Sequence, residues 1–162
     1  MASEVPGDLL PTLEEQERRL VFPSFGYDDA WRLGTLLVEF ARERRAPVAI
    51  DIRCGAQQLF HCALPGSSAD NDAWIDRKRG VVARYAESSY LVGERFRVQG
   101  TTFEESSRLD PDRYAAHGGS FPVRLSPDGP VVGTITVSGL PQAEDHRLIV
   151  EGLERYLDPG SR

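Results

Sequence analysis

The stretch of sequence that decides the fold is residues 48–64, VAIDIRCGAQQLFHCAL. In its first half every second residue is large and apolar, as expected for a strand with one buried face. Gly55 interrupts this alternation, and residues 58–64 resume it. The stretch is therefore typical of a β-hairpin, in which two antiparallel strands lie side by side.

The apolar face of this hairpin also indicates its register. A loop of three residues, 55–57, pairs Ile50 with Cys62 and keeps the apolar residues of both strands together. A two-residue loop would instead place His61 opposite Ile50, so we predict the longer loop. The same register separates Cys54 from Cys62 by about 13 Å along the strand, which is too far for a disulfide. Both cysteines are expected to be free thiols.

The rest of the chain combines helical segments with a second hairpin. Apolar spacings of three and four residues predict helices over residues 13–20, 30–41, 70–89 and 141–157. Residues 119–125 and 131–137 predict a hairpin around the turn SPDG, and residues 105–117 are irregular. Because the strands come in pairs, we expect an α+β fold, a single-domain sandwich with a central, mostly antiparallel β-sheet flanked by α-helices.

Length and charge limit the function classes. The 162 residues fit one domain, which we place at residues 12–157 between a loose N-terminus (1–11) and a loose C-terminus (158–162). The net charge of −6 argues against nucleic acid and anionic membranes as partners. No apolar segment is long enough to span a bilayer or resembles a secretory signal, so we expect a cytoplasmic protein.

Lys78 breaks the pattern of the helix predicted at 70–89. On a helical wheel its side chain falls in the middle of an apolar stripe, which consists of Trp74, Ile75, Val81, Val82 and Tyr85. Arg77 and Arg84 lie at the edge of the stripe, and Asn71 lies close to it. A buried ammonium needs an anionic partner or loses its proton. Lys78 therefore either pairs with an internal carboxylate or binds an anionic ligand.

The last predicted helix shows a similar break. His146 shares a face with the apolar residues Ile149 and Val150. The helix follows Ser138 and Gly139, where a strand runs directly into a helix N-terminus, and backbone N–H groups at such a junction can bind an anion. The alternative is that Ser138 caps the helix and His146 is a satisfied core residue.

Other candidate groups carry weaker signals. Asp51 lies opposite His61 in the predicted register, which suits either general-base chemistry or a plain cross-strand pair. His117 precedes two glycines, a pattern that also occurs in ordinary loops. The sequence contains no P-loop, no GxGxxG after a strand, no HExxH and no GxSxG, and it shows neither a catalytic signature nor a metal site.

Three motifs resemble those of one known family. They are DNDAWIDRK at 70–78 followed by Ser88-Ser89, GGSFPV at 118–123, and GTITVSGLP at 133–141 followed by Asp145-His146. Together they are similar to the signature of an uncharacterised family in the haem-degrading-domain (GlcG/HbpS-like) superfamily. The resemblance covers residues 12–157. It implies a compact α+β fold, assembly into dimers or higher homo-oligomers, and haem as the one cofactor suggested, with His117 or His146 as candidate axial ligands.

These observations favour a small-molecule binding protein whose pocket accepts an anionic group, with haem or a related tetrapyrrole among the candidates. The predicted ligand-binding residues are Asn71, Arg77, Lys78, Ser138, Gly139 and His146. The alternative is a homo-oligomeric interaction or scaffold protein without a small-molecule site. A third hypothesis is an enzyme that uses Lys78 or His146 as acid or base, and the sequence leaves that question open.

Overall fold

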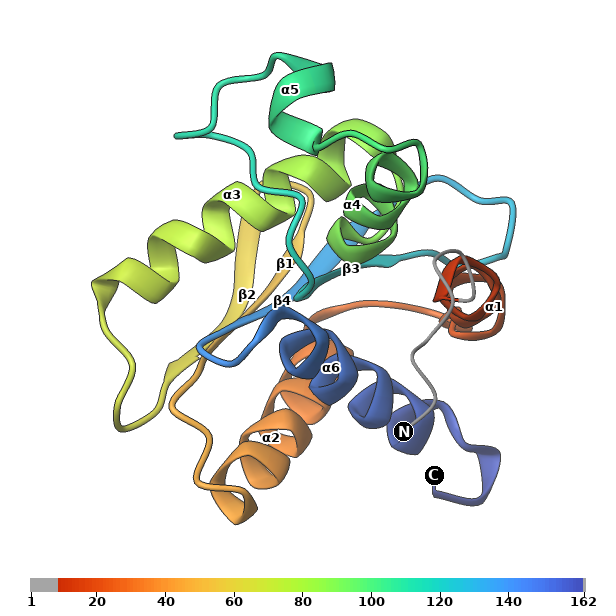
Figure 1. Ribbon diagram of the computed structural model, residues 1–162. Coiled ribbons are helices and arrows are strands. Elements are labelled where there is room, and N and C mark those ends of the chain that lie inside the picture. Colours follow the sequence, from red (N-terminus) through yellow and green to blue (C-terminus); the bar gives the residue numbers. More distant parts are fainter. Residues whose placement is uncertain (1–8, 162) are drawn as a thin grey trace, which may run out of the picture.

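One four-stranded sheet organises the chain in the computed structural model, which describes residues 9–161 (Figure 1). Its strands are β1 (Ala49–Cys54), β2 (Gln57–Ala63), β3 (Ser120–Val123) and β4 (Gly133–Ser138). They lie in the order β2-β1-β4-β3, and every neighbouring pair is antiparallel. The two predicted hairpins thus share one sheet, joined through β1 and β4, and the predicted α+β fold is confirmed.

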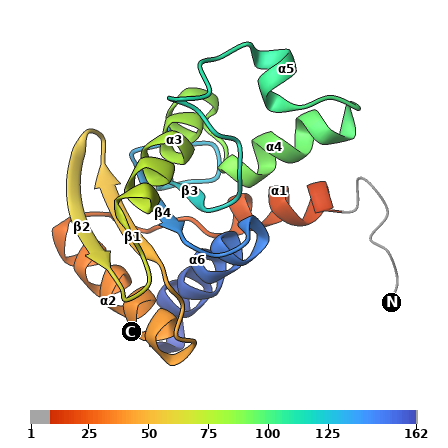
Figure 2. The same ribbon diagram turned by 60° about the vertical axis from the view of Figure 1, so that its left-hand side comes forward.

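Helices cover both faces of the sheet. They are α1 (Leu9–Arg19), α2 (Tyr27–Glu43), α3 (Ala69–Tyr85), α4 (Ser89–Val98), α5 (Phe103–Ser107) and α6 (Gln142–Leu157), followed by the short 3-10 helix η1 (Pro159–Ser161). Helices α2 and α6 pack on one face, and α3 and α4 lie on the other (Figures 1 and 2). The main hydrophobic core fills the space between the sheet and the pair α2 and α6.

The two faces of the sheet differ in chemistry. Towards α2 and α6 the strands present apolar side chains such as Ile50, Ile52 and Ile135, which are fully buried. The alternate positions present buried polar side chains, which are Asp51, Ser120, Thr134, Thr136 and Ser138. A helix that packs on such a face needs polar groups of its own, and α3 supplies Lys78 and Asn71 there. This polar layer is the setting of the candidate site.

The first hairpin has the predicted register and a different turn. Ile50 pairs with Cys62 and Ile52 with Phe60, as expected. The loop, however, has two residues, 55 and 56, because a bulge after Ile52 takes up one extra residue of β2 and restores the register. Both cysteines are free thiols.

The helix predicted at residues 70–89 ends earlier than expected, and a second helix that we did not predict follows it. Helix α3 ends at Tyr85 because Ala86 adopts a left-handed conformation, with φ of 58°, and α4 starts at Ser89. Ser88 caps α4 through its side-chain oxygen. The hydroxyl of Ser89 accepts a hydrogen bond from the backbone N–H of Ser120 at 3.0 Å. The double serine thus joins α4 to the sheet.

At the N-terminal end, the structure also differs from the predicted boundary. Helix α1 begins at Leu9, inside the segment that we expected to be loose. Residues 1–8 and 162, which belong to the predicted loose ends, lie outside the described residues. None of the helices in the described part of the chain is long and apolar enough to cross a membrane.

Candidate functional site

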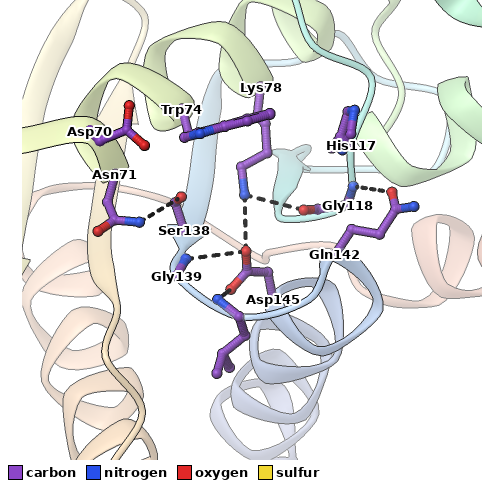
Figure 3. Close-up of a pocket in the computed structure, with 11 residues that line it drawn as sticks. Asp70, Asn71, Trp74, Lys78, His117, Gly118, Ser138, Gly139, Gln142 and Asp145 are labelled. Atoms are coloured by element: carbon purple, nitrogen blue, oxygen red, sulfur yellow. Dashed lines mark hydrogen bonds and ion pairs between the residues drawn. The ribbon is translucent and has the colours of Figure 1, made fainter. Parts of the chain in front are cut away.

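A cavity of about 280 Å³ lies between the first turns of α3 and α6, at the end of β4 (Figure 3). Its walls come from three separate parts of the sequence, which are the start of α3, the loop before β3 and the β4–α6 junction. The lining residues are Asp70, Asn71, Trp74, Lys78, His117, Gly118, Ser138, Gly139, Leu140, Gln142 and Asp145. Four of the six residues predicted as ligand-binding, Asn71, Lys78, Ser138 and Gly139, therefore meet at one place.

Lys78 forms the floor of this cavity. Its Nζ donates hydrogen bonds to the carbonyl oxygens of Val137 at 2.6 Å and Gly118 at 3.2 Å, and to Oδ2 of Asp145 at 3.2 Å. These three acceptors match the three donors of an ammonium group. Only 2% of Lys78 is exposed. The side chain is thus an internal hub that ties α3 to β4, α6 and the loop before β3.

Asp145 is the partner that the sequence did not identify. Its carboxylate also accepts hydrogen bonds from the backbone N–H groups of Leu140 at 2.9 Å and Gly139 at 3.4 Å. Those are the N–H groups of the strand-to-helix junction where we predicted a bound anion. The protein's own carboxylate therefore occupies the position expected for a ligand. Burial raises the pKa of Asp145 and lowers that of Lys78, while their mutual attraction opposes both shifts.

Glycines allow the backbone to approach this ion pair closely. Gly119 has a φ of 130°, and a Cβ atom there would lie within 3.0 Å of the Lys78 ammonium. Gly139 has a φ of 148°, and its Cβ would lie within 3.0 Å of the carbonyl oxygen of Pro47. Both positions therefore require glycine, on grounds of conformation and of space.

The wall above Lys78 carries hydrogen-bond donors that the protein leaves unused. The side-chain oxygen of Asn71 accepts the backbone N–H of Ser68, and its Nδ2 donates to Oγ of Ser138 at 3.3 Å. One N–H of Asn71, the hydroxyl hydrogen of Ser138 and the indole N–H of Trp74 have no acceptor among the described residues. The oxygen atoms of Asn71 and Ser138 are used internally and these donors remain, so this part of the wall suits a ligand that offers oxygen atoms. The carboxylate of Asp70 also lines the cavity and favours a donor group on another part of the ligand.

His117 stands at the edge of the same cavity. Its imidazole packs edge-on against Trp74, with ring centroids 5.2 Å apart. Partial burial lowers the pKa of His117, the charge of Glu104 opposes that shift, and the nearby cations Lys78 and Arg77 add to it. The lowered pKa favours the neutral ring, the form in which a histidine nitrogen can accept a hydrogen bond or bind a metal.

The two remaining predicted site residues lie elsewhere. Arg77 points away from the cavity, where its Nε donates to the carbonyl oxygen of Pro111 at 2.9 Å and its guanidinium stacks on Trp74 at 4.2 Å. His146 is 4% exposed and contacts Gln16 of α1 at 2.8 Å between its Nε2 and the amide oxygen. We therefore leave both residues out of the proposed site.

Other sequence candidates have structural partners. Asp51 and His61 lie opposite each other in the register, yet the ring of His61 contacts Asp72 at 2.7 Å. Asp51 accepts a hydrogen bond from Gln58 at 2.7 Å. They do not form an acid–base pair with each other. Among residues 9–161, no three His, Cys, Asp or Glu side chains are grouped in a way that could hold a metal ion.

Comparison with known proteins agrees with this architecture. Residues 25–154 match the family model described as haem degrading protein HbpS-like. A UPF0303 protein of Streptomyces coelicolor is 74% identical over 145 residues, which cover 90% of this chain and 91% of that protein. The crystal structure of Ybr137w protein is similar with a TM-score of 0.86 and 34% identity, covering 99% of this chain and 92% of that one. The structure of a PduOC:heme complex has a TM-score of 0.64 and 17% identity, covering 83% and 96%, and shows the shared fold alone.

Proposed function

The chain belongs to the family of HbpS-like haem-degrading proteins, and from this premise we propose that it binds a small anionic ligand in the cavity between α3 and α6. The ligand would present carboxylate oxygens to the unused donors of Asn71, Ser138 and Trp74. Haem or a related tetrapyrrole, which carries propionate groups, is one candidate. The proposal concerns ligand binding and makes no statement about a reaction.

The observation that carries this proposal is the imbalance between donors and acceptors in the cavity wall. A wall built only for packing would pair its polar atoms internally. Here the oxygen atoms of Asn71 and Ser138 are engaged, while hydrogen atoms on Asn71, Ser138 and Trp74 are free. These donors come from α3 and β4 and face the same cavity. An oxygen atom of a ligand can therefore accept the hydrogen bonds that water would otherwise accept.

Lys78 supports the same site by holding its walls and not by contact with the ligand. Its three donors are fully used, so it offers no free hydrogen to a ligand. Asp145 balances its charge. The first turns of α3 and α6 both begin at the cavity, and the positive ends of two helix dipoles favour negative charge there. Neutral donors and helix ends thus attract the ligand, whereas Lys78 and Asp145 hold the walls in place.

Haem fits part of this site. The neutral imidazole of His117 is a suitable iron ligand, and it is the one described histidine that lines the cavity. The volume of about 280 Å³ is at the lower end of ligand pockets and accommodates an edge of a tetrapyrrole, not the whole macrocycle. When bound, haem would supply redox and oxygen chemistry. His117 and Trp74 would hold the group, and Asn71 with Ser138 would bind an acidic substituent.

Tryptophan fluorescence offers a direct test. The chain has two tryptophans, and Trp31→Phe leaves Trp74 in the cavity wall as the single emitter. Titration of this variant with haemin should give a saturable shift of the Soret band together with quenching of Trp74 emission. Titration with succinate, as a small dicarboxylate probe, should change the emission without a Soret signal. No response to either probe at millimolar succinate and micromolar haemin would overturn the proposal.

Matched variants locate the response. Ser138→Ala in the Trp31→Phe background should weaken binding of both probes, since it removes one donor from the wall. His117→Ala should abolish the Soret shift while it leaves the succinate response in place. His61→Ala, which changes a histidine outside the cavity that contacts Asp72, is the control and should alter neither signal.

A second candidate function is that of a homo-oligomeric scaffold. Tyr27 and Trp31 lie one turn apart on α2, and they are 71% and 64% exposed. Large aromatic side chains at the surface are typical of protein interfaces. Light scattering that shows a dimer or larger assembly, reduced to monomer by Tyr27→Ser with Trp31→Ser, would support this function. A monomer at micromolar concentration would exclude it.

A further inference from the structure

A second cavity, of about 640 Å³, lies on the outer side of α3, between the helix and residues 110–114. Its lining is rich in arginine. Four arginine residues line it, three from α3 and one from the facing loop, and these are Arg77, Arg79, Arg84 and Arg113. None of the residues that line the first cavity lines this one. The two sites therefore use different faces of the same helix.

One glycine of α3, Gly80, allows the loop that borders this cavity to pack closely on the helix. Arg77 and Arg84 are seven residues apart and so lie on the same face of α3, with Gly80 between them. A Cβ atom on Gly80 would lie 3.0 Å from the carbonyl oxygen of Arg113 and 3.4 Å from the ring of Tyr114. The loop therefore rests directly on the helix at this point, and its side chains extend to either side.

The loop is held firmly in that position. Nε of Arg77 donates to the carbonyl oxygen of Pro111 at 2.9 Å, and the N–H of Ala115 donates to the carbonyl oxygen of Arg77 at 3.1 Å. Within the loop, the backbone N–H groups of Arg113 and Tyr114 both donate to the carbonyl oxygen of Asp110, each at 3.0 Å. A site on this loop is preorganised, so binding of a ligand would not carry the entropic cost of ordering the loop.

Two of the four arginines have no ion-pair or hydrogen-bond partner for their side chains among the described residues. Arg79 pairs with Asp76 at 3.2 Å, and Arg77 is engaged with the loop. Arg84 and Arg113 make no ion pair or hydrogen bond through their side chains among the described residues, and each guanidinium carbon lies 5.7 Å from the centroid of Tyr114. Two unpaired guanidinium groups are thus anchored beside one aromatic ring.

The local charge opposes that of the whole protein. Four arginines and two aspartates, Asp76 and Asp112, line the cavity, which gives 4 − 2 = +2. The chain as a whole carries −6. A basic concave surface on an acidic protein concentrates anions there and repels them from the rest of the surface. Arg77 and Arg84, which the helical wheel placed at the edge of the apolar stripe, contribute to this positive charge, whereas Asp145 balances the charge of Lys78.

We infer that this cavity binds the phosphate groups of a phosphorylated small molecule, with Arg84 and Arg113 as the binding residues. A guanidinium group presents two parallel N–H donors that match two oxygens of one phosphate. Two unpaired guanidinium groups held around Tyr114 match a diphosphate better than a single carboxylate. The volume of the cavity leaves space for the organic part of such a ligand beside the phosphates.

Isothermal titration calorimetry with pyrophosphate tests this inference on the whole protein. Wild-type protein should bind one pyrophosphate per chain, and the affinity should fall as sodium chloride is raised, because the contacts are ionic. Arg84→Gln with Arg113→Gln should weaken binding by about tenfold or more, since two charge-assisted contacts are lost. Circular dichroism should show that this double variant is folded, as both side chains are exposed.

Two controls separate the site from other sources of binding. Arg42→Gln removes an exposed arginine on α2 and should leave the pyrophosphate affinity unchanged, as should Ser138→Ala in the first cavity. Equal binding by wild type and the Arg84–Arg113 double variant would overturn the inference. So would a change in molecular mass by light scattering in the double variant, since it would mean that a second copy of the chain covers these arginines.

Discussion

The ammonium of Lys78 lies 3.2 Å from Oδ2 of Asp145, and the two residues are 2% and 3% exposed. They connect the middle of α3 to the first turn of α6 through the polar face of the sheet. Each also binds backbone groups, Lys78 two carbonyl oxygens and Asp145 two N–H groups. A buried ion pair of this kind is tolerated because hydrogen bonds to the backbone support both charges.

Removal of one partner should therefore be costly. We expect Lys78→Met to lower the free energy of unfolding by about 3–5 kcal/mol, because the carboxylate of Asp145 stays buried without its counter-charge. Adding Asp145→Asn to that variant should restore part of the loss, since it removes the unpaired charge. Urea unfolding of the two single variants and the double variant measures the coupling. Strictly additive effects would show that the pair is not coupled.

Glu17 should make stability depend on pH near neutrality. Burial raises the pKa of Glu17 to about 7, although a hydrogen bond from the N–H of Ser88 and the charge of Arg124 act in the opposite direction. The folded protein therefore holds a proton that the unfolded chain releases above its ordinary pKa of 4.5. Stability from this group is complete below pH 4.5 and is lost as the pH rises to about 7, by at most about 3 kcal/mol.

Glu17→Gln separates this contribution from others. The variant should match wild type near pH 4.5 and exceed it in stability at pH 8, because its neutral amide can still accept the N–H of Ser88. Glu15→Gln, an exposed change on the same helix, should not alter the pH dependence of unfolding. A constant difference between Glu17→Gln and wild type from pH 4.5 to 8 would contradict the prediction.

His146 should act in the opposite direction at lower pH. Burial lowers the pKa of His146 to about 4, and its Nδ1 is the one buried side-chain N or O atom without a partner among the described residues. Below pH 6.5 the unfolded chain gains a proton that the folded protein excludes, so stability falls as the pH drops towards 4. The loss at pH 5 should be about 2 kcal/mol. His146→Leu should reduce this acid sensitivity in urea unfolding followed at pH 5 and pH 8.

The sequence indicated Lys78 as unusual but could not identify what it contacts. Its place in an apolar stripe is a local pattern, and local patterns are readable from periodicity. Asp145 is 67 residues away, and the two meet only because β4 leads directly into α6. The same limit applies to His117, whose loop is placed by contacts of Gly118 with Lys78 and Gln142. Pairings across the sheet between distant segments are decided by tertiary packing.

For the same reason, the sequence predicted the fold better than it predicted the site. Alternation in residues 48–64 predicted the hairpin and its register, because side-chain period and burial are coupled in a strand. The end of α3 at Tyr85 was predicted too late, since the left-handed conformation of Ala86 carries no glycine or proline signal, and α4 was not predicted. Arg77 lies outside the first cavity because its side chain turns outward to bond to Pro111. A helical wheel gives the position of a residue around the helix and does not show such a turn of the side chain.

Gly139 should tolerate substitution less than Gly55, which also has a positive φ. Its φ is 148°, and a Cβ there would lie within 3.0 Å of the backbone oxygen of Pro47, which cannot move without shifting β1. Gly55 also has a positive φ, 56°, but no atom lies within 4 Å of its added Cβ. We expect Gly55→Ala to cost about 1 kcal/mol from conformation alone. Gly139→Ala should cost about 3 kcal/mol or more, because a clash with fixed backbone adds to the conformational strain.

Thermal and urea unfolding of the two glycine variants measure that difference, and the cavity offers a second readout. Gly139→Ala should also weaken the response of Trp74 emission to succinate, since Gly139 and Ser138 share the wall of the first cavity. Gly55→Ala, at the far end of β1, should leave that response unchanged. Equal losses of stability in the two variants would show that the approach of Gly139 to Pro47 is not what requires glycine at the β4–α6 junction.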